Sequence, residues 1–331
     1  MLVEKSGAGA RVENGSLSQY AHCLALMLLL TVLGLSVTSC ATLPHRHWPD
    51  LAAYEPDRQE IKSVPFFAQE AFQCGPSTLA MVLAWSGITM NPGSVASKVF
   101  TPSKRGALQP AMISAARRYG RIAYPISGPE EMLTEVAAGH PVIVLQNLGL
   151  SWFPKWHYAV VIGYDLDEGC VILHSGRTPR KRMALRVFDK TWARSNRWAL
   201  LVLSPGDLPA TAEQAPFLSA VLGLEKAGQW EAAVEGYRAA LDHWPGSLGA
   251  LMGLGNSYYA LGEKVAAADT FRLATQRFPT QGCAFNNLAQ VLWEQGKHQE
   301  AVEAARRAVS TGGPLSHVYR KTLEQIEADP P

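Results

Sequence analysis

Neither sign of charge is in large surplus in this chain of 331 residues, where 30 lysines and arginines stand against 28 aspartates and glutamates. The net charge of +2 is small for this length, so the composition gives no general electrostatic case for binding nucleic acid or an anionic membrane surface, and any partner has to be argued locally. The sequence also lacks a P-loop, an HExxH pair and a GxGxxG turn after a strand, which excludes the common nucleotide and zinc-peptidase motifs. We therefore expect no nucleic-acid partner, no cofactor and no metal.

Cysteines are few and unpaired. Five occur, and none belongs to a CxxC pair or to the spacing of a disulfide framework. Each cysteine therefore has to be interpreted from its own neighbours, and packing is the simplest role for Cys170 and Cys283. The hydrophobic share of 47% is enough for two ordinary globular domains.

The N-terminal segment contains an apolar run, residues 24–37, which has the length of a signal-peptide core and is short for a bilayer-spanning helix. Small residues and then Cys40 follow it, an order that resembles the lipobox of bacterial lipoproteins. The resemblance implies a cleaved signal peptide over residues 1–39, a lipid on the Cys40 thiol and a place on the periplasmic face of the outer membrane. The alternatives are an uncleaved spanning helix over residues 21–43 and a buried core helix. Residues 40–60, with several prolines and many polar side chains, are predicted to form a tether.

The first folded domain is predicted over residues 61–204, and its most informative feature is the start of a helix. Good helix formers with apolar side chains follow Pro76 as far as Gly87, a natural stop signal. Proline fits the first helical turn, so Cys74 lies at the positive end of this helix. Unpaired backbone amides and the helix dipole favour its thiolate there, which is the nucleophilic form. The alternative for a lone cysteine is a small buried packing residue.

A histidine opens a strand later in the same domain. His157 begins a run of strand formers that ends near Tyr164, and a short apolar strand that ends at Asn147 precedes it. Two further helices are predicted over residues 108–119 and 129–138. The pattern indicates helices packed on an antiparallel sheet, in which a histidine taken alone is more often structural than catalytic.

Three sequence features follow one another in this domain: a glutamine, then Cys-Gly-Pro at a helix start, then His-Tyr-Ala-Val-Val-Ile-Gly-Tyr-Asp on a strand. This order resembles that of the papain-like cysteine peptidases of the double-glycine leader type. The resemblance covers residues 63–203 and implies an α+β papain-like fold. In that family the cysteine attacks the peptide carbonyl, the histidine moves the proton and a preceding glutamine helps to hold the oxyanion. The matching positions are Cys74, His157 and Gln69, with Gln73 as the less favoured glutamine.

The third catalytic residue departs from the family pattern. Relatives have an aspartate on the strand after the histidine, and a tight turn would fold residues 174–177 back beside His157. Ser175 is then the positional match, and Asn147 is a reachable substitute by analogy with papain-like enzymes that use asparagine. The basic run that follows, residues 177–182, is predicted to be a solvated loop or a contact for an acidic group.

The second domain, residues 214–329, follows a linker over residues 205–213 and has an internal period. Three glycines recur at intervals of 34 residues: Gly228, Gly262 and Gly296. This period, with small residues kept at the same interval, is the signature of the tetratricopeptide repeat. It predicts an all-α superhelix of three units, with residues 315–328 as a capping helix. Such a superhelix binds extended peptides or partner helices in its groove.

Together these features predict a cysteine peptidase held at the membrane by a lipid, which hydrolyses a peptide bond through a Cys-His dyad. The repeats would recruit the peptide or protein substrate, or a protein partner. A catalytically silent scaffold that binds peptides or proteins is the alternative from another class, and the missing aspartate favours it. An acyl transferase would use the same dyad.

Replacement of Cys40 tests the lipid. The Cys40→Ser chain should lose its partitioning into the detergent phase, because the thiol that would receive the lipid is gone. Phase separation in a nonionic detergent measures this, with Cys23→Ser as a control that should partition like the unchanged chain. Partitioning that persists in Cys40→Ser would indicate a spanning helix instead.

Overall fold

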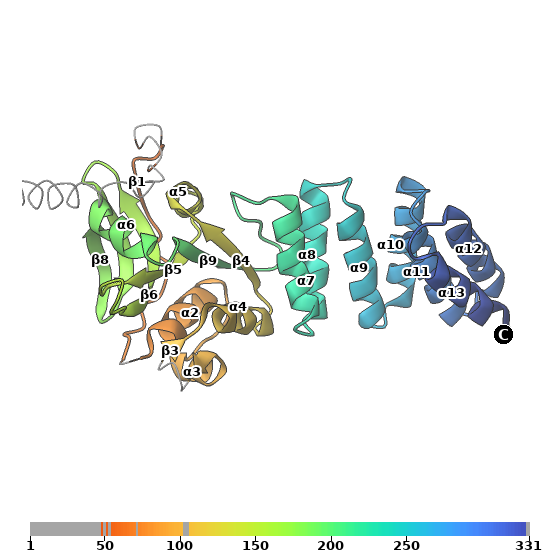
Figure 1. Ribbon diagram of the computed structural model, residues 1–331, viewed down its shortest axis with the longest axis horizontal. Helices are drawn as coiled ribbons and strands as arrows, with labels where there is room; N and C mark the ends of the chain where they lie inside the picture. Colours follow the sequence, from red (N-terminus) through yellow and green to blue (C-terminus); the bar gives the residue numbers. More distant parts are fainter. Residues whose placement is uncertain (1–47, 49–50, 52–53, 71, 102–105, 329–331) are drawn as a thin grey trace, which may run out of the picture. The chain divides into compact units, whose positions relative to one another are not determined.

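The computed structural model describes residues 48, 51, 54–70, 72–101 and 106–328 (Figure 1). The chain divides into two units, residues 1–48 and 49–331, and the described helices and strands belong to the second. The predicted signal peptide, Cys40 and most of the predicted tether lie outside the described residues. Within the described part of the chain, no helix is long and apolar enough to cross a bilayer.

The described residues of the first domain include nine strands. They are β1 (Arg58–Glu60), β2 (Phe100–Thr101), β3 (Gly106–Ala107), β4 (Ile122–Ser127), β5 (Val142–Asn147), β6 (Trp156–Asp165), β7 (Cys170–Ser175), β8 (Thr178–Ala184) and β9 (Trp198–Leu203). The main sheet has the order β4-β9-β5-β6-β7-β8, and β1 pairs with β6 beyond the end of β5. All pairings are antiparallel, and β2 and β3 form a separate small sheet.

The interior strands β5 and β9 show why the sequence has continuous apolar runs in this domain. Every residue of β5 is buried, and so is nearly every residue of β9. Because successive side chains of a strand point to opposite faces, both faces of these strands are covered. A strand without a solvent-facing side is apolar throughout instead of alternating.

In the described part of this domain, five helices accompany the sheet. They are α2 (Cys74–Trp85), α3 (Pro92–Val99), α4 (Gln109–Arg118), α5 (Pro129–Ala137) and α6 (Leu185–Ala193). Helix α2 packs against β5 and β6, and α6 packs against β5, β7 and β8 (Figure 1). From Gly75 to Leu83 every residue of α2 is buried, so this helix is enclosed by the domain on all sides. The predicted helices at residues 108–119 and 129–138 correspond to α4 and α5.

Two segments differ from their predictions. The last three residues of the predicted tether form β1, which is too short to show an alternating pattern. The basic run predicted as a loop forms most of β8, at the edge of the sheet. Two of its cations are paired, Arg180 with Glu60 and Arg182 with Asp165. An edge strand with charged, exposed side chains has no apolar face, so its sequence resembles that of a loop.

The linker after the first domain is held by a buried carboxylate of α5. Glu135 is fully buried and accepts hydrogen bonds from the backbone N–H (2.7 Å) and the hydroxyl (2.6 Å) of Thr211. The Nδ1 atom of His140 lies 2.6 Å from the same carboxylate. A buried charge without such partners would be strongly destabilising, so these contacts fix the linker to the domain.

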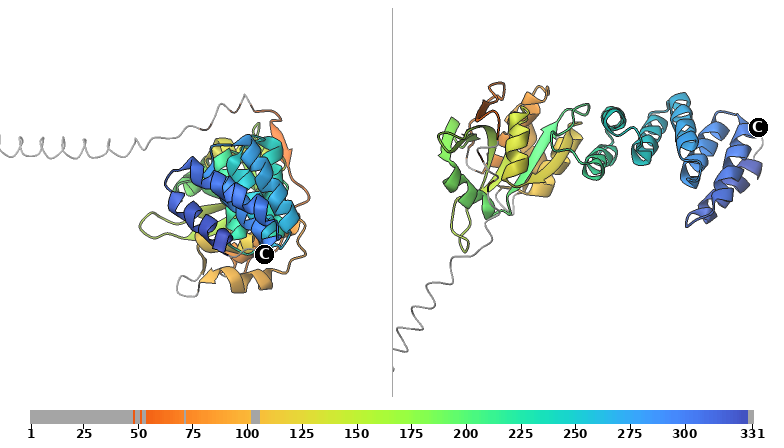
Figure 2. Two further views of the ribbon diagram at one scale, coloured as in Figure 1. Left: turned by 90° about the vertical axis from the view of Figure 1, so that its right-hand side faces the viewer. Right: turned by 90° about the horizontal axis from the view of Figure 1, so that it is seen from above.

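From the linker to residue 328, where the description ends, the chain forms seven helices: α7 (Gln214–Glu225), α8 (Trp230–His243), α9 (Leu248–Ala260), α10 (Lys264–Arg277), α11 (Gly282–Glu294), α12 (His298–Thr311) and α13 (Ser316–Ala328). Each helix packs against the next along the chain (Figure 2). The three periodic glycines have φ values of 72°, 78° and 74°, which favour glycine, in the turns after α7, α9 and α11. The 34-residue period therefore corresponds to three helix pairs, and α13 is the predicted capping helix.

Gly255 of α9 allows the close approach of α10, and a methyl group there should destabilise the repeats. A Cβ at Gly255 would lie 2.4, 2.7 and 2.8 Å from three ring atoms of the buried Phe271. We expect Gly255→Ala to lower the free energy of unfolding by about 1 to 2 kcal/mol, the cost of overpacking less the gain in helix propensity. Urea denaturation followed by circular dichroism measures this.

The matched control lies on the same helix. In Gly249→Ala the new Cβ would meet only the flexible end of Leu218, at 3.2 Å, so its free energy of unfolding should be unchanged or higher. Equal free energies of unfolding for the two variants would show that crowding against Phe271 does not destabilise the repeats.

Candidate active site

Cys74 is the first residue of α2, and close packing fixes this end of the helix. A Cβ at Gly75 would lie 2.5 Å from the Cβ of Ala107 in β3 and 3.3 Å from the Sδ of Met112. Glycine is therefore the residue that lets the helix come this close to β3. The first backbone N–H groups of a helix have no acceptor within it. The sulfur of Cys74 thus lies at a helix end where backbone donors and the helix dipole stabilise negative charge.

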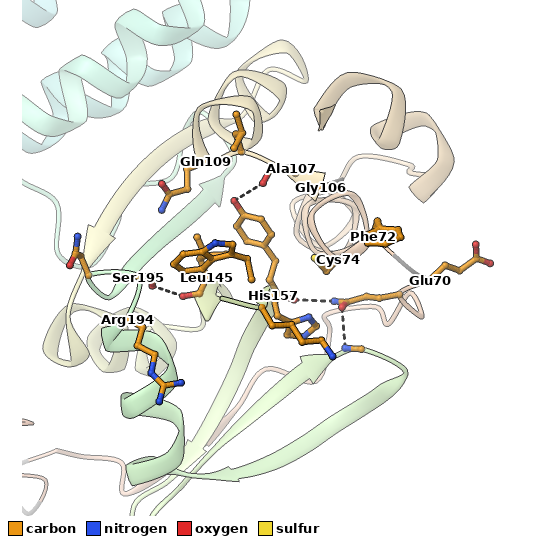
Figure 3. A pocket seen from close by; sticks show the side chains of 17 residues that line it. Glu70, Phe72, Cys74, Gly106, Ala107, Gln109, Leu145, His157, Arg194 and Ser195 are labelled. Atoms are coloured by element: carbon orange, nitrogen blue, oxygen red, sulfur yellow. Dashed lines mark hydrogen bonds between the residues drawn. The ribbon is translucent and has the colours of Figure 1, made fainter. Parts of the chain in front are cut away.

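Cys74 and His157 line the same cavity, which has a volume of about 920 Å³. Figure 3 shows both side chains at this cavity, that of Cys74 at the end of α2 and the imidazole on β6. Gln69 and Arg194 also line this cavity. Three of the predicted site residues, Gln69, Cys74 and the sequence-distant His157, thereby line one cavity.

Ser175 contacts the imidazole through the β6–β7 hairpin. The Nε2 atom of His157 lies 2.9 Å from the Oγ of Ser175. In the antiparallel pairing Val160 is opposite His174, which brings the end of β7 back to the first residues of β6. His174 is on the other face, with its Nε2 3.2 Å from the carbonyl oxygen of Val64. Since Nε2 of His157 is engaged by the serine, Nδ1 is the ring nitrogen that remains for another partner.

Gln69 is buried at the cavity and is held by β6 and by the turn directly after β7. Its Nε2 donates to the carbonyl of Tyr158 at 3.3 Å, and its Oε1 accepts from the N–H of Gly176 at 3.1 Å. The amide has a second hydrogen that can serve a substrate oxygen. The less favoured Gln73 precedes α2, where its carbonyl accepts from the N–H of Ser77, and it is not among the described residues that line the cavity.

Asn147 has a different set of contacts from the one its predicted catalytic role requires. Its Oδ1 accepts from the N–H groups of Gly149 (3.0 Å) and Lys155 (2.9 Å), and its Nδ2 donates to the carbonyl of Leu150. These bonds hold the connection between β5 and β6. The register explains this, because Asn147 pairs with Trp156, whereas Gln146 is the residue opposite His157.

The imidazole of His157 is uncharged at neutral pH. Burial, together with the positive charges of Lys181 and Lys155, lowers the pKa of His157 to about 4. Ser175 orients the ring without the negative charge by which an aspartate would raise this pKa. His157 is therefore neutral at pH 7 and can act as a base.

Two features of the cavity were not predicted from the sequence. Phe72, at the cavity wall, has a φ of 64°, a left-handed conformation that aromatic residues rarely adopt. Residue type gives no signal for it. Lys155 and Trp156 also line the cavity, and here their position directly before His157 was a usable signal.

Comparison with known proteins identifies both parts of the chain. Residues 61–200 match the model of the Peptidase_C39 like family, and residues 218–282 and 284–316 match the model of the tetratricopeptide repeat. The chain therefore contains a C39-like peptidase domain followed by tetratricopeptide repeats. The predicted fold class, an α+β peptidase-like domain before an all-α repeat region, is confirmed.

Several solved structures are similar to this chain at low identity. A C39-like peptidase from Bacillus anthracis is 20% identical with a TM-score of 0.38, over 44% of this chain and 97% of its own. A double-glycine-motif protease of an AMS/PCAT transporter, in complex with the leader peptide, is 21% identical with a TM-score of 0.34, over 44% and 93%. The tetratricopeptide domain of Sgt2 from Aspergillus fumigatus is 22% identical with a TM-score of 0.33, over 37% and 87%. No curated protein matches the sequence.

Replacement of Lys181 should raise the pKa of His157. Lys181→Gln removes a positive charge that disfavours the imidazolium, so the titration should move from about pH 4 toward the ordinary value of 6.5. The ring proton resonances of His157, followed by NMR against pH, measure the shift. Lys190→Gln, which changes an exposed lysine of α6, is the control and should leave the titration of His157 unchanged.

The same shift has a consequence for stability. Unfolded chains bind a proton at this histidine near pH 6.5 and the folded chain near pH 4, so folding stability falls as the pH drops through this window. Lys181→Gln should reduce that loss. An identical titration of His157 in both chains would contradict the electrostatic origin of the low pKa.

Proposed function

We propose that this chain is a membrane-anchored cysteine peptidase that hydrolyses a peptide bond through Cys74 and His157. The proposal rests on one observation. The thiol at the N-terminus of α2 and the imidazole at the start of β6 line one cavity, with the ring oriented by Ser175. The family match over residues 61–200 supports it.

The geometry supports a mechanism with His157 as general base. As the sulfur of Cys74 attacks the peptide carbonyl carbon, neutral His157 takes the thiol proton. The N–H groups at the start of α2 and the amide of Gln69 stabilise the negative oxygen that forms. His157 then gives the proton to the leaving amine, and a thioester remains. Water, deprotonated by the same imidazole, releases the acid and restores the thiol.

The serine in place of a carboxylate also favours an alternative that is not an enzyme, a catalytically silent scaffold. Ser175 orients the imidazole but does not stabilise its charged form, so the base is weak and the enzyme should be slow or narrowly specific. If the dyad is silent, the cavity and the repeats form a scaffold that binds peptides or proteins. An acyl transferase would pass the same acyl group to an amine or a thiol in place of water.

The proposal also assigns a binding role to the repeats and a membrane location to the chain. Tetratricopeptide repeats bind extended peptides or helices in their groove, so the repeats would bring the substrate or a protein partner to the cavity. A lipid on Cys40 would hold the chain on the periplasmic face of the outer membrane. The apolar run and small residues before Cys40 are the support for this location.

Labelling of Cys74 separates a peptidase from a scaffold. We expect stoichiometric labelling by iodoacetamide at near-neutral pH and its loss in His157→Ala, because the thiol then has no base within reach. Peptide mass spectrometry follows each cysteine separately. The half-buried Cys283 of α11 is an internal control whose labelling should not depend on His157. Labelling of Cys74 that is slow and indifferent to His157 would support the scaffold.

A second arm of the experiment restores the carboxylate. Ser175→Asp puts a negative charge beside Nε2 of His157, which should raise the pKa of the imidazole by about 1 to 3 units and speed the labelling of Cys74 about tenfold. The control Ser175→Ala should slow the labelling, since the ring loses its orienting hydrogen bond. A raised pKa of His157 without faster labelling would show that the imidazole does not act on this thiol.

A further inference from the structure

The connection between β5 and β6 exposes large apolar side chains that neither the fold nor the proposed chemistry explains. We call residues 148–156 the apolar loop. Trp152 is 81% exposed and Phe153 72% exposed, and Leu148, Leu150 and Trp156 are exposed as well. So many exposed apolar residues in one short segment indicate an interaction site.

The apolar loop is held in shape by its own hydrogen bonds. The N–H of Leu148 donates to the carbonyl of Lys155 at 2.9 Å, and Leu150 and Phe153 exchange N–H to carbonyl bonds at 3.1 and 3.2 Å. A Cβ at Gly149 would lie 2.4 Å from the carbonyl oxygen of Phe153, so glycine is needed for this close turn. The backbone thus presents the Trp152 and Phe153 side chains to solvent as a fixed feature.

Helix α6 adds positive charge next to the apolar loop. Arg194, directly after α6, donates to the carbonyls of Asn147 (3.0 Å) and Gly149 (2.6 Å) at the base of the loop. Arg186 and Lys190 precede it by two turns and one turn and are exposed on the same side of the helix. The buried side chains of α6 are Leu185, Phe188 and Trp192.

No acidic residue of α6 or of the apolar loop neutralises the positive charge of Arg186, Lys190 and Arg194. The one acidic residue of α6, Asp189, is paired with Arg197 at 2.8 Å. The apolar loop contributes a further cation, Lys155, and no acidic residue. An anionic surface therefore complements the helix face and the loop together.

We propose that the apolar loop inserts into the interface of a phospholipid bilayer while the cationic face of α6 lies against anionic headgroups. Tryptophan and phenylalanine prefer the headgroup region of membranes, and clustered lysines and arginines are attracted to anionic lipids. An apolar peptide is the poorer candidate, because peptides bind in grooves and a side chain that is 81% exposed, as Trp152 is, has no groove around it. The contact is separate from the proposed lipid on Cys40 and does not depend on Cys74 being a nucleophile.

The test uses residues 49–331, which form one compact unit and exclude the predicted lipid site. Sedimentation with vesicles of phosphatidylcholine containing about a quarter phosphatidylglycerol measures the partition coefficient. We expect Trp152→Ser/Phe153→Ser to lower it at least about tenfold. Val265→Ser removes an apolar side chain that is 70% exposed on α10, and this control should bind like the unchanged segment.

The charge contribution is tested on α6. Arg186→Gln/Lys190→Gln should weaken binding to the vesicles with phosphatidylglycerol about tenfold, leave binding to pure phosphatidylcholine unchanged and reduce the dependence on salt. Unchanged thermal unfolding of all variants would show that the fold is intact. Vesicle binding that survives Trp152→Ser/Phe153→Ser would overturn the proposal. So would a loop-dependent self-association, seen by sedimentation velocity, in a segment that does not bind vesicles.

Discussion

The close packing of α2 on the sheet is the constraint on which the cavity depends. Because Gly75 has no side chain, the first turn of the helix comes up to Ala107 and to the ring of Tyr158. The hydroxyl of Tyr158 donates to the carbonyl of Ala107 at 3.2 Å, which ties β6 to the same place. His157 is the neighbour of Tyr158 on β6, as Cys74 is the neighbour of Gly75 on α2. The thiol and the imidazole therefore take their separation from the contact made by the residues beside them.

The repeat region could be predicted from the sequence because its turns and helix crossings require particular residue types. A turn with positive φ selects glycine, and the crossing of two helices selects a small residue such as the fully buried Ala233, Ala267 and Ala301. In the first domain, apolar spacing located α2, α4 and α5. The stripe of Leu185, Phe188 and Trp192 has the apolar spacing of a helix and is the sequence signal for α6. Helix α3 is short and contains glycine and serine, so its formation depends on packing against α2 and α4.

At the site, the order of residues in the sequence predicted their spatial neighbours where a hairpin joins the two strands. The connection after β6 is short, so Ser175 had to return beside His157, and Gln69 had to lie near the start of α2. Asn147 shows the limit of this reasoning, since a residue one place along a strand pairs with a different partner and here serves the loop. The lowered pKa of His157 could not be predicted from the sequence, because Lys181 acts on the imidazole through space from another strand. The conformation of Phe72 has no sequence signal either.

Lys155 joins two properties of the molecule that are otherwise independent. It lies at the base of the exposed loop, lines the cavity, and its charge helps to keep His157 neutral. Any anion that pairs with this ammonium group cancels part of that field, so the imidazole becomes more basic in the presence of the anion. By thermodynamic reciprocity, protonation of the imidazole must also strengthen the hold on the anion. The proton affinity of the base is therefore coupled to whatever covers the rim of the cavity, without any movement of the backbone.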